Sequence, residues 1–185
     1  MSTKKPRGPR VHLDHSFGPY YDKSSRILIL GSFPSVKSRE MNFYYGHPQN
    51  RFWKIMAALY KESAPESLEE KKNFLTRNHI AVYDVIESCS IIGSADSTIE
   101  DVRVTDLTPI LAGSQIGSRI FVNGGKACAL YQKYQLPVTH IEAAKLPSSS
   151  PANAAYSLDR LIHLWGEALG TKGDGSAGVA LRQGP

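Results

Sequence analysis

Aromatic and amide side chains crowd residues 31–53 of the sequence. This segment contains GSFPS at 31–35 and YYGHPQNRFW at 44–53. Small residues such as Gly31 and Ser32 let a backbone approach a ligand closely, and aromatic faces beside the Asn50 amide suit a flat heterocycle that is both stacked and hydrogen-bonded. An aromatic cluster covering the core under a long loop would have the same composition. The residue types alone favour neither interpretation.

Two further segments carry groups that can bind an anion. His47 and Pro48 precede an expected helix at 50–60, and helix N-termini attract phosphate, although His47 can equally cap the helix or pack in the core. Residues 146–154 read LPSSSPANA, and three hydroxyls there precede another expected helix: Ser148, Ser149 and Ser150. A Ser-Pro helix entry is also common in proteins that bind nothing. Each segment alone therefore indicates a phosphate site only weakly.

Asn123 ends an apolar run, RIFVN, that is stopped by Gly124 and Gly125. Its amide offers one donor and one acceptor, which could read the edge of a base. A turn residue ahead of two glycines is the structural alternative.

The elements that must position these residues alternate along the chain. Apolar runs predict strands at 26–30, 80–86 and 119–123 and a weaker one at 138–141. Helical spacing predicts helices at 50–60, 66–77, 126–134 and 154–169, the last with Ser150 as its cap and Pro151 at its first position. This alternation predicts a three-layer α/β/α sandwich around a short, mainly parallel four-stranded sheet. Ligands bind outside the carboxyl ends of such strands, where residues 31–50, 123–125 and 146–153 should converge.

Composition fits one globular domain, and its basic charge gives a modest signal for binding nucleic acid or another polyanion. The 185 residues carry a net charge of +5, and no apolar run approaches the roughly 18–20 residues that span a bilayer. We expect a flexible basic arm at 1–10, one domain at 11–170 and a flexible tail at 171–185. The N-terminal residues lack the apolar stretch of a secretory signal, so we expect a cytoplasmic protein. Cys89 and Cys128 cannot form an all-cysteine metal site within one chain, and we expect two reduced thiols.

Four motifs together resemble one family. GSFPS at 31–35, YYGHPQNRFW at 44–53, FVNGGKA at 121–127 and LPSSSPANA at 146–154 are similar to the motifs of the hypoxanthine-DNA glycosylases, a branch of the uracil-DNA glycosylase superfamily. The resemblance covers residues 14–169. It implies the uracil-DNA glycosylase-like α/β fold and a monofunctional enzyme without metal or cofactor. Such an enzyme flips a deaminated base, hypoxanthine first and uracil second, out of DNA and hydrolyses its glycosidic bond.

The resemblance also assigns a catalytic residue. Mismatch-specific uracil glycosylases carry a catalytic Asn in the turn after the first strand, where this chain has Phe33, and phenylalanine cannot orient water. The hypoxanthine branch uses an Asn in its HPxN segment instead, which corresponds to Asn50. Its amide would hold the attacking water. No lysine stands where a Schiff-base nucleophile is expected, and Lys126 is interpreted as a support of the fold.

The remaining site residues follow from the same resemblance. Tyr45 would lie under the flipped base, Gly46 would keep the pocket wall open for a purine, and Asn123 would read the base edge. Asp84 and Asp96 fall near the pocket in some relatives, but residues 97–100 also read as a helix capping box, which favours a structural Asp96. The expected base-binding residues are Tyr45, Gly46, Asn123, Ser32 and Phe33, and the expected DNA-phosphate ligands are His47, Ser148, Ser149 and Ser150.

Two other functions remain open at the level of sequence. An α/β enzyme acting on free nucleosides or nucleotides would share the crevice and the anion cradle. A catalytically silent module that binds damaged DNA would explain Phe33. The expected partner is DNA, double-stranded or single-stranded, with a deaminated base, bound by a monomer that contacts no membrane.

Overall fold

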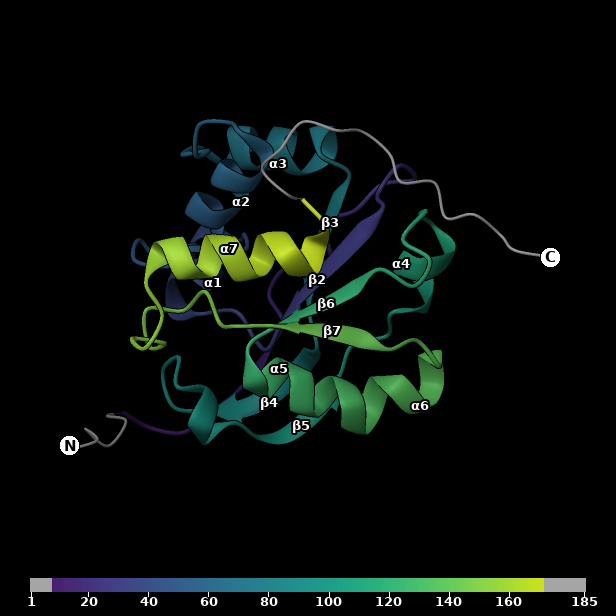
Figure 1. The fold of residues 1–185 in the computed structure, drawn as a ribbon. Helices are drawn as coiled ribbons and strands as arrows, with labels where there is room; N and C mark the ends of the chain where they lie inside the picture. Colours follow the sequence, from purple (N-terminus) through teal and green to yellow (C-terminus); the bar gives the residue numbers. More distant parts are fainter. Residues whose placement is uncertain (1–7, 172–185) are drawn as a thin grey trace.

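The computed structural model describes residues 8–171, and its centre is a parallel sheet (Figure 1). The strands are β2 (Ile27–Gly31), β3 (Ile80–Asp84), β6 (Ile120–Asn123) and β7 (Ala143–Leu146), in the order β3-β2-β6-β7. All neighbouring pairs are parallel, as the alternation of strands and helices predicts. No helix within the described residues is long and apolar enough to cross a bilayer.

Side-chain alternation along β2 builds two cores. Ile27 and Ile29 point to one face, where they belong to a core shared with three helices: α2 (Phe52–Tyr60), α3 (Leu68–Arg77) and α7 (Leu158–Leu169). Leu28 and Leu30 point to the other face. That face is covered by α4 (Thr108–Ala112), α5 (Gly125–Leu130), a π-helical turn at Tyr131–Gln135 and α6 (Leu136–Thr139). The three-layer arrangement expected from the sequence is confirmed.

A second, antiparallel sheet completes this other face. It consists of β1 (Val11–Asp14), β4 (Ile86–Ile91) and β5 (Glu100–Val104), in the order β1-β4-β5. The expected strand at 80–86 is in fact two strands, because the chain leaves the parallel sheet at Val85, whose N–H donates to the Gly31 carbonyl at 2.9 Å. β1 and β5 are absent from our sequence-based assignment. Most of their residues are exposed, and their polar residues conceal the strand pattern.

Three local predictions are wrong. Residues 138–141 form the end of α6 and the turn after it, and the fourth strand is β7, an edge strand of small and charged residues with little apolar signal. The last helix begins at Leu158 and is capped by Ser157, whereas Ser150 and Pro151 lie in an irregular loop. Residues 97–100 do not start an α-helix. A single 3₁₀ turn, Asp96–Thr98, leads directly into β5.

The termini lie partly outside the described residues. Residues 1–7 and 172–185, which make up most of the expected arm and tail, are not described. Arg10, at the end of the expected arm, pairs with Glu100 at 3.2 Å, so this part of the arm is tied to β5.

Candidate active site

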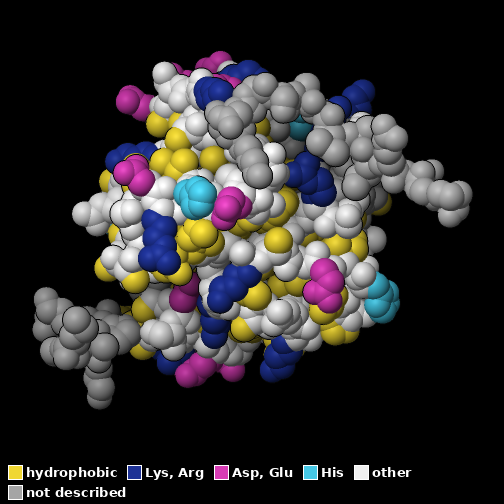
Figure 2. Space-filling model, in the orientation of Figure 1, with side chains coloured by type: hydrophobic (Ala, Val, Ile, Leu, Met, Phe, Trp, Pro, Cys, Tyr) yellow, Lys and Arg dark blue, Asp and Glu magenta, His cyan; other side chains and the backbone are white. Residues whose placement is uncertain are grey.

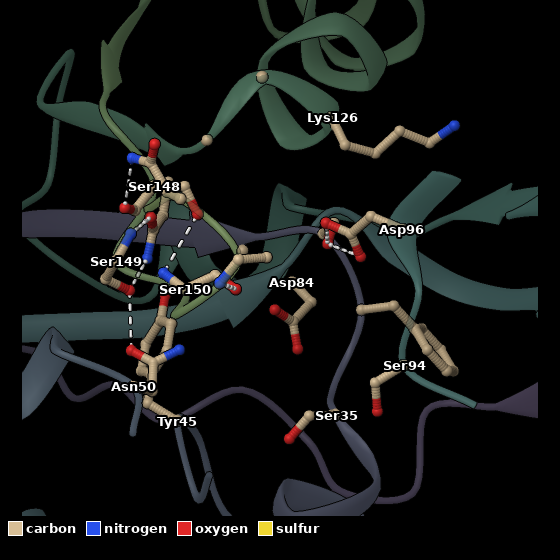
Figure 3. A pocket seen from close by; sticks show the side chains of 18 of the residues that line it. Ser35, Tyr45, Asn50, Asp84, Ser94, Asp96, Lys126, Ser148, Ser149 and Ser150 are labelled. Atoms are coloured by element: carbon tan, nitrogen blue, oxygen red, sulfur yellow. Dashed lines mark hydrogen bonds between the residues drawn. The ribbon is translucent and has the colours of Figure 1, made fainter. Parts of the chain in front are cut away.

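A cavity of about 710 Å³ opens at the carboxyl ends of the parallel strands. Gly31, Asp84 and Asn123 end β2, β3 and β6 at its floor, and the serine-rich loop after β7 forms one side (Figure 3). Its other walls come from the loop after β2 and from residues 94–97. The expected convergence of three loops is therefore confirmed. A volume of this size accommodates a base and part of its sugar.

A buried serine links three of these segments through one chain of hydrogen bonds. The Ser149 N–H donates to Asn123 Oδ1 at 3.0 Å, and Asn123 Nδ2 donates back to Ser149 Oγ at 2.9 Å. The Ser149 hydroxyl gives its proton to Asn50 Oδ1 at 2.9 Å, and the Phe52 N–H donates to the same oxygen at 2.9 Å. Because the two backbone N–H groups can only donate, they fix the orientation of both amides and the direction of every bond between them.

This chain of hydrogen bonds determines which part of Asn50 faces a ligand. Both lone pairs of Oδ1 are engaged, by Ser149 and Phe52. Nδ2 forms no hydrogen bond within residues 8–171, and Figure 3 shows it turned away from Ser149. Asn50, the residue expected to be catalytic, therefore lines the cavity as a fixed hydrogen-bond donor.

Arg51 holds the serine-rich loop against the segment that carries Asn50. Its guanidinium donates to the carbonyls of Ser149 at 3.3 Å, Ser150 at 2.6 Å and Asn153 at 3.0 Å, and to that of Tyr156. A guanidinium carries five N–H donors in a rigid fork, so one arginine can serve several carbonyls at once. The sequence gives no signal for this role, because the carbonyls that Arg51 contacts lie about 100 positions further along the chain.

Tyr45 lies in the cavity wall in an unusual backbone conformation. Its φ of 53° is in the left-handed region, and its ring stacks on Phe52 with centroids 3.8 Å apart at 14°. One ring face is therefore occupied, and a base can stack only on the other. The hydroxyl is buried and forms no hydrogen bond of normal geometry within residues 8–171. Burial, with a smaller contribution from the Asp84 charge, raises the Tyr45 pKa well above its usual value, while the nearby Asn123 side chain opposes this shift.

Gly46 requires a correction. A Cβ at this position would lie 3.0 Å from Met41 Sδ and 3.1 Å from the Lys37 carbonyl, in the helix α1 (Val36–Met41). Gly46 is therefore small because α1 packs against it, and it does not line the cavity. The expectation that Gly46 makes room for a purine does not fit this geometry.

Ser32 and Phe33 line the cavity next to an acidic side chain. The Ser32 hydroxyl lies 3.0 Å from both carboxylate oxygens of Asp96. Partial desolvation raises the pKa of Asp96, while the Ser32 hydrogen bond and the positive charge of Lys126 oppose this shift and Asp84 adds to it. Asp96 thus belongs to the cavity rather than to a helix cap. Lys126 also lines the cavity, which corrects its interpretation as a support of the fold alone.

Asp84 and His15 form a buried pair that sequence reasoning did not identify. His15 Nε2 lies 2.8 Å from Asp84 Oδ2, and the side chains are 2% and 6% exposed. Gly31 makes this possible, since a Cβ there would lie 2.4 Å from Asp84 Oδ1. His15 follows β1, and no motif or spacing in the sequence links it to Asp84.

Only some of the expected phosphate ligands have hydroxyls at the cavity. Ser148 and Ser150 line the cavity, and their hydroxyls accept hydrogen bonds from the N–H groups of Ser150 and Ala152 at 3.2 Å. Ser149 is 1% exposed with its hydroxyl fully engaged, so a direct contact with phosphate does not fit this residue. His47 is not in the cavity wall, and its Nδ1 accepts from the Gln49 N–H at 3.1 Å.

Positive charge is present at the cavity without forming a large uniform patch. Lys145, a residue not expected at the site, lines the cavity together with Lys126, and neither forms an ion pair within the described residues. Figure 2 shows basic side chains scattered among acidic and apolar ones over the face seen in Figure 1. The electrostatic attraction for a polyanion is therefore moderate over this face and is supplied locally at the cavity by these lysines.

Comparisons with known proteins agree with the geometry. The family model described as the uracil DNA glycosylase superfamily matches residues 19–167. A hypoxanthine DNA glycosylase from Methanosarcina acetivorans is 34% identical over 149 residues, which are 80% of this chain and 93% of the relative. One from Methanosarcina barkeri is 31% identical over 154 residues, 83% of this chain and 96% of the relative.

A solved structure shares the fold as well as the sequence. The solution NMR structure of a candidate uracil DNA glycosylase from Methanosarcina acetivorans has a TM-score of 0.72 and is 31% identical, covering 87% of this chain and 99% of its own. The family match spans the three cavity loops and the strands that carry them. The chain belongs to the uracil DNA glycosylase superfamily and is a DNA glycosylase.

Proposed function

We propose that this chain is a monofunctional glycosylase that flips a deaminated base out of DNA and hydrolyses its N-glycosidic bond. Hypoxanthine is the preferred base and uracil the second, and the product is an abasic site for base excision repair. The names of the two Methanosarcina relatives support hypoxanthine. The enzyme acts in the cytoplasm as a monomer and uses no metal or organic cofactor.

The single observation that carries the proposal is the fixed amide of Asn50. Its oxygen is held by Phe52 N–H and Ser149 Oγ, so its Nδ2 offers an N–H to the cavity. That N–H can donate to the oxygen of a water molecule while leaving the second lone pair of the water free to attack. Holding a nucleophile in one orientation contributes to rate by positioning and needs no strong base.

The bond changes are simple. The bond between C1′ and the base nitrogen breaks with its electrons leaving on the base, and the sugar develops oxocarbenium character. The water held by Asn50 adds to C1′ and loses a proton to solvent or to a DNA phosphate, while the base is protonated as it departs. Electrostatic stabilisation of the cationic sugar by DNA phosphates supplies much of the rate.

Tyr45 and the cavity rim account for binding. The free face of the Tyr45 ring stacks on the flipped base, opposite the face held by Phe52. Ser148 and Ser150 contact DNA phosphates through their hydroxyl groups, and Lys126 and Lys145 add charge. His47, outside the cavity wall, lies at the edge of this contact. Duplex DNA is the proposed substrate, and a single strand would offer the same flipped nucleotide.

Duplexes that carry hypoxanthine or uracil test the proposal through the abasic sites that form. Asn50→Ala should lower the single-turnover rate by about 100-fold or more and leave affinity for the damaged duplex within a few-fold of wild type. Asn73→Ala, on the exposed side of α3, is the matched control and should be fully active.

Three results would contradict the proposal. Full activity of Asn50→Ala would remove the catalytic assignment. Release of hypoxanthine from free inosine, with no action on DNA, would favour a nucleoside enzyme. Binding to damaged duplex without an abasic product from the wild-type protein would indicate a silent binding module.

A further inference from the structure

The Asp84 carboxylate lines the cavity and has no role in the proposed reaction. It ends β3 beside Gly31 of β2, on the opposite side of Gly31 from Asn123 of β6. Figure 3 shows it inside the cavity, between the Asn50 and Asp96 sides. A buried carboxylate costs free energy unless partners hold it, so its position at the floor requires an explanation.

His15 holds this carboxylate in one orientation. Its Nε2 contacts Asp84 Oδ2 at 2.8 Å, and its Nδ1 accepts a long hydrogen bond from the Phe17 N–H at 3.4 Å. Because a backbone N–H can only donate, this arrangement favours the tautomer whose Nε2 carries the hydrogen and donates it to Asp84. The ring is also enclosed by Phe17 and Tyr83 at 4.7 Å and 5.1 Å.

The other carboxylate oxygen is left for a ligand. Asp84 Oδ1 receives no hydrogen bond from residues 8–171, and it lies against the Gly31 backbone, in the space that a side chain at position 31 would fill. An ionised carboxylate accepts hydrogen bonds and cannot donate. The cavity floor therefore offers a charged acceptor on one side of Gly31. On the other side is Asn123, whose Oδ1 and one N–H are used by Ser149 and whose second N–H lies near the Tyr45 hydroxyl.

This pair of groups matches the change that deamination makes to a base. Deamination converts a ring nitrogen with a lone pair and an exocyclic amine into a ring N–H and a carbonyl. Hypoxanthine and uracil present this lactam edge, whereas adenine and cytosine present the reverse pattern. A carboxylate attracts the ring N–H and repels the ring lone pair, and an amide N–H attracts the carbonyl.

We propose that Asp84, positioned by His15, accepts a hydrogen bond from the ring N–H of the flipped base and so selects deaminated bases over adenine and cytosine. This inference rests on the proposed glycosylase function. Asp84 is the specificity residue in contact with the base, and His15 is its positioning residue. The remaining N–H of Asn123 donates to the base carbonyl.

A cycle of two proteins and two substrates tests the contact. Wild type and Asp84→Asn are compared in single-turnover excision from duplexes carrying hypoxanthine or unsubstituted purine, which has a lone pair at the same ring position and no carbonyl. Hypoxanthine excision should fall by about 10- to 100-fold in the variant, and purine excision should be unchanged or faster. Differences in leaving-group ability cancel, because each substrate is compared with itself.

A binding measurement completes the test with bases that cannot be cleaved. On duplexes with 2′-fluorinated sugars, Asp84→Asn should bind hypoxanthine more weakly and adenine more tightly than wild type. Asp159→Asn, an exposed acid at the start of α7, is the matched control and should change neither affinity. His15→Gln, which keeps a donor, should retain the preference for hypoxanthine, and His15→Ala should lose part of it.

The outcomes separate this inference from the function on which it rests. An equal loss of rate on both substrates, with no change in base preference, would mean that Asp84 acts on water or on the fold, and the inference would be overturned. A wild-type protein that excises no base from any duplex would instead overturn the proposed function.

Discussion

Ser149→Ala is the most informative substitution in this protein, because the serine is buried, its hydroxyl is fully engaged, and it determines how Asn50 is held. The change removes one oxygen atom from a side chain that is 1% exposed and leaves the backbone N–H bond to Asn123 in place. It removes the hydrogen bond to Asn50 Oδ1 and the one from Asn123 Nδ2, both 2.9 Å long. The cavity wall otherwise keeps its shape.

The expected costs follow from these two bonds. A buried polar group that loses its partner costs about 1–3 kcal/mol, so the free energy of unfolding should fall by roughly that amount. Asn50 keeps only the Phe52 N–H as a restraint, and its amide can then rotate. Misplacing a reacting group by about 1 Å costs on the order of 100-fold in rate, so the single-turnover rate should fall by about 10- to 100-fold. Affinity for damaged DNA should change little.

Urea unfolding and single-turnover excision from a hypoxanthine duplex measure the two effects. Ser67→Ala is the stability-matched control, because it removes the cap of α3, costs about 1 kcal/mol and does not touch the cavity. If Ser149→Ala lost stability but kept the wild-type rate, the orientation of Asn50 would not depend on Ser149. The reasoning from the hydrogen-bond chain to catalysis would then be wrong.

Two further substitutions test the surroundings of this chain. In Arg51→Lys, the single ammonium group cannot reach the four carbonyls that the guanidinium contacts. The free energy of unfolding should therefore fall by about 1.5–3 kcal/mol, and hydrogen exchange of the amides in residues 149–156 should accelerate. An unchanged exchange rate would mean that Arg51 does not hold the loop. Burial raises the pKa of the Cys89 thiol to about 11 from 9.0, so its contribution to stability is complete below pH 9 and is lost between pH 9 and pH 11. Between pH 9 and pH 11, the free energy of unfolding should therefore fall by roughly 1–3 kcal/mol more in wild type than in Cys89→Ala. Parallel pH profiles of the two proteins in urea unfolding would contradict this.

The architecture could be predicted because its central strands are buried on both faces. Residues 27–30 are all apolar, and each residue of β2 is buried, so a continuous apolar run identifies the strand directly. The edge strand β7 offers no such pattern, since Ala143, Ala144 and Lys145 precede one buried leucine. The antiparallel sheet was missed for a related reason, as β1 and β5 are exposed along most of their length. Strands that bury little side-chain area leave little signal.

The site could be located from the sequence, but its internal contacts could not. Motifs placed Asn50, Asn123 and the serines at one edge of the sheet, because loops after parallel strands must meet there. Whether a polar side chain faces a ligand or another part of the protein depends on contacts between residues about 100 positions apart, such as the one between Ser149 and Asn50. His15 and Asp84 are 69 positions apart, and neither belongs to a motif.

Ser149 and Arg51 show why the polar motifs of this protein must be considered together. By type, a serine in a serine-rich loop and an arginine beside an aromatic cluster both suggest contacts with DNA. In the structure both are used to join the loop after β7 to the start of α2, and through this junction Asn50 is held at the cavity. Because these contacts set the orientation of Asn50 within the protein, no free energy is spent on reorienting its amide at the moment of reaction. We therefore expect substitutions at these two residues to lower the rate of excision more than the affinity for DNA, which is the opposite of what phosphate ligands would do.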